Sequence, residues 1–173
     1  MAGLALGVLA CAGGSEEVRG GPASPASRRP PPGELRAATL FFPGLGDQLV
    51  KEERSLATGT PEERIRAIIL ALLEGPTVPE ARPALPDDTS IGGIYLGAGD
   101  VAYLDLHRPE NKPPPPMGSL QETLMIYSLV NSVVLNIQGV ERLSLLWNGA
   151  QHPSLAGHLS NGGPLEPRPR LAR

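Results

Sequence analysis

Clusters of proline and glycine set the limits within which this chain can fold. The 173 residues include 20 prolines and 21 glycines, and both gather in residues 20–33 and around residues 113–116. Such segments bury too little apolar surface to offset the entropy lost on ordering, so they form linkers or loops. The pattern predicts a flexible tether over residues 12–36, one domain over residues 37–165 and a disordered tail over residues 166–173.

The first half of the domain is expected to hold a strand and a clearly marked helix. Residues 38–42 (ATLFF) form a short apolar run that predicts a buried strand, and residues 49–56 add a short extended piece. Thr60 and Glu63 have the capping-box spacing that begins a helix, and Gly75 ends it. Its buried face is predicted from five residues at helical spacing: Ile65, Ile68, Ile69, Leu72 and Leu73.

The second half repeats this alternation of strands and a helix. Residues 91–96 and 101–106 predict a β-hairpin. Ser119 as the cap, with Glu122 three residues on, predicts the start of a second helix that ends near Gly139.

A strand over residues 143–147 and an Asn148-Gly149 turn predict a return strand from about Ala150. The resulting order is β-α-β-β-α-β-β, which predicts an α+β fold: a small sheet with two helices packed on one face. Residues 37–165 are numerous enough to bury a core without a metal or a disulfide.

The single cysteine lies in a pattern typical of lipid attachment. Cys11 follows the apolar stretch MAGLALGVLA, with a small residue directly before it, as in the lipobox of bacterial lipoproteins. Residues 1–11 lack a basic n-region, so they have the form of a truncated lipoprotein signal. We expect lipidation at Cys11 and an exported protein on the outer face of the plasma membrane or in the outer membrane. The alternative is an ordinary, unmodified cysteine.

Candidate catalytic and metal-binding residues are few. His107, His152 and His158 lack the spacing of a helical metal pair and have no evident third ligand, so no metal or cofactor site is predicted. Asp105 lies late in a strand and is expected to accept hydrogen bonds from backbone amides of the following turn rather than to act as a general base. Without a nucleophile motif or a phosphate loop, the chain is not expected to be an enzyme.

Charge and aromatic content bear on the choice of partners. The formal net charge is −3 and only 3% of the residues are aromatic, so the basic, aromatic face of a nucleic-acid binder is not expected. Asn131 and Ser132 are polar positions inside an apolar helix. They indicate either a contact surface or satisfied polar residues at the helix rim.

Ordered phrases over residues 38–165 resemble the GerMN domain family. The phrases are LFFP and LVKEER (residues 40–43 and 49–54), LLEGP (72–76), LP (85–86), DVAYLDL (100–106), GS and YSL (118–119 and 127–129), the pattern from Val140 to Gly149, and LAGHL with PL (155–159 and 164–165). The resemblance implies a non-catalytic envelope protein, often a lipoprotein, related to sporulation and germination factors and to actinobacterial sensor-associated lipoproteins. It also implies a fold like the ring-building motifs of secretion and sporulation channels.

These observations together favour an envelope-anchored binding or scaffolding module. Its expected partners are envelope proteins or peptidoglycan, and its contact with the membrane is expected through the lipid at Cys11. Two alternatives stay open. One is a homo-oligomeric assembly module of an envelope complex, and the other is a cell-wall hydrolase that uses Asp105 with a glutamate or a histidine.

Overall fold

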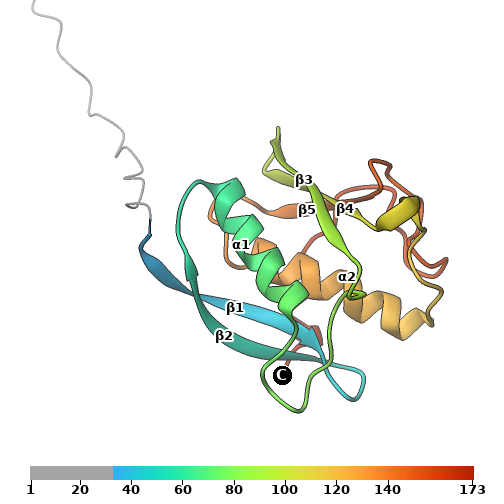
Figure 1. Ribbon diagram of the computed structural model, residues 1–173, viewed down its shortest axis with the longest axis horizontal. Coiled ribbons are helices and arrows are strands. Elements are labelled where there is room, and N and C mark those ends of the chain that lie inside the picture. The colour runs from blue at the N-terminus through green and yellow to red at the C-terminus, as the bar shows by residue number, and fades with distance from the viewer. Residues whose placement is uncertain (1–32) are drawn as a thin grey trace, which may run out of the picture.

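Two helices and two small sheets make up the domain, which confirms the predicted α+β class (Figure 1). The computed structural model describes residues 33–173. Its elements, in chain order, are β1 (Leu35–Pro43), β2 (Leu49–Ala57), α1 (Pro61–Glu74), β3 (Ser90–Gly97), β4 (Val101–His107), the 3-10 turn η1 (Pro109–Asn111), α2 (Ser119–Val134), β5 (Arg142–Trp147) and the 3-10 turn η2 (Pro169–Leu171).

The order of the strands differs from the prediction. Residues 49–57 form a full strand, β2, because all nine of them pair in antiparallel register with β1. The return strand expected from about Ala150 is reduced to a single bridge with Trp147. The free edge of β5 is occupied instead by Leu165, whose backbone donates to Leu143 over 2.8 Å and accepts from it over 2.9 Å.

The strands form two sheets rather than one, and the helices lie between them (Figure 1). β1 and β2 are one antiparallel pair. In the second sheet, β4 pairs antiparallel with β3 and parallel with β5. α1 contacts β2 and β3, and α2 contacts β1 and β5, so each helix packs against both sheets.

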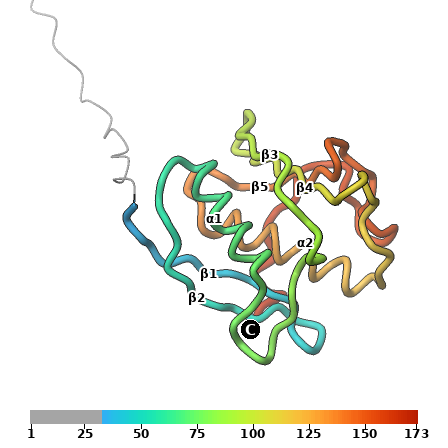
Figure 2. Tube along the Cα trace, in the orientation of Figure 1, coloured from blue at the N-terminus to red at the C-terminus, as the bar shows by residue number. Residues whose placement is uncertain are grey.

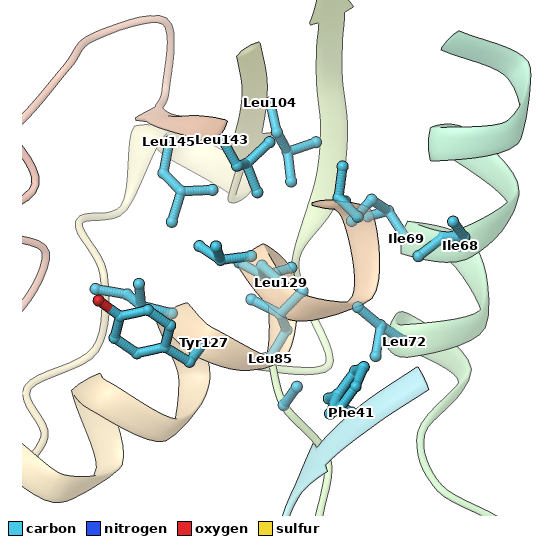
Figure 3. Packing of buried hydrophobic residues seen from close by; sticks show 14 of the residues in the cluster. Phe41, Ile68, Ile69, Leu72, Leu85, Leu104, Tyr127, Leu129, Leu143 and Leu145 are labelled. Atoms are coloured by element: carbon cyan, nitrogen blue, oxygen red, sulfur yellow. The ribbon is translucent and has the colours of Figure 1, made fainter. Parts of the chain in front are cut away.

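Aliphatic side chains fill the space between the layers. Leu104, Leu143 and Leu145 point from the second sheet toward Leu129 of α2, as Figure 3 shows. Burial of each such side chain stabilises the fold by about 1.5–3 kcal/mol. Four of the six aromatic residues of the chain are also buried: Phe41, Phe42, Tyr127 and Trp147.

Helix α1 begins as the sequence predicts. The Thr60 backbone N–H donates to the Glu63 carboxylate over 2.7 Å, and the Glu63 N–H donates to the Thr60 hydroxyl over 3.2 Å, which completes the capping box. Four of the five residues predicted for its inner face, Ile65, Ile68, Ile69 and Leu72, are buried, and Leu73 is half-buried.

Helix α2 begins and ends differently from the prediction. Gly118, not Ser119, is the N-cap, and its N–H donates to the Gln121 side chain over 3.3 Å. Glu122 does not cap the helix, because its carboxylate accepts hydrogen bonds from the loop of residues 154–159. The helix ends at Val134 rather than near Gly139.

The Ser132 side chain of α2 and the Asn136 side chain, two residues beyond its end, bind the edge of β1 that faces away from β2. The Ser132 hydroxyl accepts the Phe41 N–H over 2.9 Å. The Asn136 side-chain amide accepts the Thr39 N–H over 2.9 Å and donates to the Thr39 carbonyl over 2.8 Å, as a neighbouring strand would. The helix therefore satisfies a sheet edge that would otherwise expose unpaired backbone groups.

The C-terminal residues pack on the domain, which corrects the prediction of a disordered tail. The Asn131 side-chain amide accepts the Arg168 N–H over 2.7 Å and donates to its carbonyl over 3.1 Å. The Arg168 guanidinium lies 4.6 Å from the centre of the Tyr127 ring. Ala172 bridges to Leu49, so the last residues, red in Figure 2, lie beside the β1–β2 pair. These long-range contacts outweigh the local preference of a proline- and arginine-rich segment.

Candidate functional site

The three histidines singled out in the sequence have different partners within the domain: Asp105 for His107, and backbone carbonyls for His152 and His158. His152 Nε2 is 3.3 Å from the Trp147 carbonyl oxygen, and His158 Nε2 is 3.1 Å from that of Met117. Within residues 33–173, no three histidine, cysteine or acidic side chains gather as metal ligands would. Cys11 lies outside the described residues.

Asp105 and His107 are brought together on the face of β4 that points away from the helices. Asp105 Oδ2 is 2.7 Å from His107 Nε2, and Oδ1 accepts the Gly149 N–H over 2.9 Å. That amide belongs to the turn after β5, not to the turn after β4 as predicted. Gly92, at a bulge in β3, leaves room for the pair, because a Cβ there would collide with the imidazole. Each Asp105 oxygen already has a partner, which suits support of the turn better than proton abstraction.

Asn131 and Ser132 do not form a contact surface for partners. Both side chains are fully buried and satisfied by backbone groups of Arg168 and Phe41. The expectation of satisfied polar residues is correct, although they lie in the interior rather than at the helix rim.

Glu122 is the functional residue whose role was not predicted from the sequence. Its fully buried carboxylate gathers a loop: Oε1 accepts from the Ser154 hydroxyl and the Leu155 and Ala156 N–H groups, and Oε2 from the His158 and Leu159 N–H groups, over 2.7–3.1 Å. The loop of residues 154–159 therefore wraps around one negative charge.

These hydrogen bonds also set the ionisation of Glu122. Burial has the largest single effect and raises the pKa of the carboxyl, but the donors from Ala156, Ser154, His158 and Leu159 together hold the pKa below its ordinary value. The group is therefore a buried carboxylate anion at neutral pH, and its stability derives from the preorganised N–H groups.

An apolar groove lies beside this loop, where the β1–β2 turn, the segment before β3 and the start of α2 meet. Its volume is about 450 Å³. Its lining residues are Pro43, Gly44, Leu45, Gly46, Arg82, Pro83, Ala84, Leu85, Pro86, Pro115, Met117, Leu120, Gln121, Leu124 and Met125. Arg82 is the one ionisable group among them.

The floor and the rim of the groove differ in exposure. Leu85 and Leu124 are buried in the floor, whereas Leu45 and Leu120 at the rim are 59% and 47% exposed. Large exposed leucines around a concave apolar surface are typical of a contact site rather than of a core.

Backbone hydrogen bonds fix each wall of the groove. The Leu45 N–H donates to the Glu80 carbonyl over 3.1 Å, and the Arg82 N–H donates to the Pro43 carbonyl over 2.8 Å. The Met117 wall is held by His158, which belongs to the loop around Glu122. The carboxylate of Glu122 thus supports the groove through the loop that it organises.

No helix within residues 33–173 is both long and apolar enough to cross a membrane. The two sheets around two helices define a small α+β module with a preformed apolar groove.

This module corresponds to a known family. Residues 39–152, more than half of the chain, match the model of the Germane family, described as sporulation and spore germination. The chain belongs to this family, and the resemblance found in its sequence phrases is confirmed. A search among curated proteins finds no significant match.

Solved structures share the fold at low sequence identity. A candidate lipoprotein from Clostridium perfringens is 20% identical, with a TM-score of 0.55 over 77% of this chain and 88% of its own. The first GerMN domain of the sporulation protein GerM from Bacillus subtilis is 16% identical, with a TM-score of 0.58 over 76% and 97%. The tandem GerMN domains of the same protein give 13% and 0.51 over 77% and 45%.

Proposed function

We propose that this protein is a non-catalytic binding module, held at the bacterial cell envelope by a lipid on Cys11, that docks an apolar segment of another envelope protein in the groove. The observation that carries the proposal is the composition of that groove. Its lining side chains are apolar except those of Gln121 and Arg82, so it offers contact area without the paired ionisable groups that turnover needs.

The fixed walls favour binding with little loss of entropy. Four prolines line the groove, and backbone hydrogen bonds at Leu45 and Arg82 hold its loops. A surface already in its bound shape loses less conformational freedom when a partner docks.

Charge narrows the choice of partner segment. The Arg82 guanidinium has no ion-pair partner among residues 33–173. A segment with leucine-like side chains for the groove and an acidic residue beside them complements this surface.

Site-specific crosslinking in living cells tests the groove. A photo-reactive amino acid at Leu45 or Leu120 is expected to yield a defined protein adduct, whereas the same residue at Leu70 is not. Leu70 is the matched control because it is 49% exposed yet lies outside the groove. Equal adducts from all three positions, or an adduct that persists when Leu45→Asp is combined with the probe at Leu120, would contradict the proposal.

Metabolic labelling with a fatty acid tests the anchor separately. Label is expected in the full chain and not in Cys11→Ala. A chain that takes up no label would remove the basis for membrane attachment while leaving the groove to be judged by crosslinking.

Homo-oligomeric assembly is the second candidate function. The edge of β3 that faces away from β4 has no strand partner within the described residues, so it offers backbone groups for pairing. Light scattering that finds only monomer at high protein concentration would argue against this alternative.

A further inference from the structure

The two aromatic residues that are not buried lie side by side on one sheet face. Of the six aromatic residues in the sequence, only Tyr95 and Tyr103 are not buried. Tyr95 of β3 is 62% exposed and Tyr103 of β4 is half-buried, and the two are direct partners in the antiparallel register. Their face is opposite to the one on which Ala102 and Leu104 enter the core.

Glycines allow both rings to lie against the sheet. A Cβ atom at Gly93 would be 2.5 Å from the Tyr95 hydroxyl oxygen, and one at Gly97 would be 2.6 Å from Tyr103 Cε2. Each ring therefore covers a glycine, and the ring of Tyr95 is largely exposed to solvent. From Gly93 to Gly97 the rings cover a strip of about 13 Å.

Polar groups border this strip without giving it a net positive charge, because Arg142 of β5 at the Gly97 end is offset by Asp105 at the Gly93 end. Ser144 of β5 is the register partner of Tyr103, and its hydroxyl accepts from the exposed side-chain amide of Gln151 over 3.1 Å. On the next row, Asp105 is paired with His107.

We infer that this tyrosine strip is a binding site for an uncharged glycan strand. The C–H groups on one face of a sugar ring pack on the electron-rich face of an aromatic ring. The sugar hydroxyls at the ring edge need hydrogen-bonding groups, which the side-chain carbonyl of the exposed Gln151 and the partly exposed imidazole of His107 supply. A nucleic acid or an anionic lipid would need a basic face, which the strip does not offer. The inference goes beyond the groove and does not depend on it.

The test measures binding of the full chain to protein-free peptidoglycan sacculi and to chitohexaose, an uncharged oligosaccharide. Both probes are expected to bind, and Tyr95→Ala combined with Tyr103→Ala is expected to weaken both by about tenfold or more. Changing both tyrosines to phenylalanine should retain most of the affinity, because stacking needs the ring. Leu96→Ala, on the opposite face of β3, is the matched control.

Several results would overturn the inference. Binding to neither probe, binding to sacculi alone, and equal affinity of the double-alanine variant would each exclude stacking on sugar rings. Binding that is lost at high salt would indicate an anionic ligand instead. The variant Leu45→Asp with Leu120→Asp should bind both probes normally. Failure of the groove proposal is therefore distinguishable from failure of the glycan-binding inference.

Discussion

At the residue scale, Glu122 organises a whole loop through one side chain. One buried carboxylate accepts five hydrogen bonds from residues 154–159, and it contributes to the position of Met117 through His158. Charge-assisted hydrogen bonds of this kind are about twice as strong as neutral ones.

Replacing Glu122 with glutamine should destabilise the domain by about 3 kcal/mol at neutral pH. The glutamine NH₂ group would face backbone N–H donors where a carboxylate oxygen now accepts. Urea unfolding measures the change, with the exposed Glu80→Gln as the control. A loss equal to that of the control would mean that the loop does not depend on this charge.

The sequence does not reveal this role because its partners are distant. Glu122 stands three residues after Ser119, which is also the spacing of a capping box. The local pattern therefore assigns Glu122 to the cap of α2, which the structure shows to be incorrect. The hydrogen bonds to Ser154 and Leu159 span 32 and 37 residues and have no local signature. The available signal was Gly157, three residues after Ser154, because this spacing of serine and glycine indicates a turn.

At the scale of elements, α2 takes the place of a third strand beside β1. Ser132 of α2 and Asn136 just after it bind backbone groups of Phe41 and Thr39, so the helix and the turn that follows it protect the edge of the two-stranded sheet. A two-stranded hairpin alone is marginally stable in water, which gives these contacts their importance.

Ser132→Ala should cost about 1–3 kcal/mol of unfolding free energy, because the buried Phe41 N–H would lose its acceptor. Ser128→Ala is a matched control on the same helix. Its hydroxyl is equally buried but donates to the Leu124 carbonyl, one turn back on its own helix. Thermal unfolding of the two variants gives the difference, and equal midpoints would contradict a role for Ser132 at the sheet edge.

The elements with a clear local pattern, such as α1 and the β3–β4 hairpin, are predicted well, whereas the full length of β2 and the segment at the edge of β5 are not. Thr60 and Glu63 satisfy each other within one turn, so α1 begins where the sequence indicates. β2 carries Lys51, Glu53 and other polar residues, and its strand conformation depends on its register with β1. The same holds for Ala150, where Leu165 occupies the edge that a return strand would need.

At the scale of the whole molecule, two buried acids make stability depend on pH. Burial raises the pKa of Glu52, but hydrogen bonds from Thr77 and Arg54 and the charge of Arg54 outweigh it and lower the pKa, as the loop donors do for Glu122. A lowered folded-state pKa contributes stability above the unfolded value, about 4.3, and that contribution is lost as the pH falls through the folded pKa.

The unfolding free energy should therefore be nearly constant from about pH 7 to pH 5 and should fall below about pH 4.3. Glu122→Gln should start from a lower value at neutral pH and show a shallower decline on acidification, since one of the titrating groups is gone. Urea midpoints across this range measure both curves. Parallel curves for the two proteins would show that Glu122 does not contribute to the acid response.

The course of β1 has a mechanical consequence. The strand begins at Leu35, where the preceding chain enters the domain, and ends at Pro43 in the wall of the groove. At about 3.3 Å per residue, these ends are roughly 26 Å apart. Tension between an anchor ahead of Leu35 and a protein held in the groove would run along the strand axis. The covalent backbone of β1 would carry that tension first, and any force passed to the other walls of the groove would load the hydrogen bonds along β1 in shear rather than one at a time.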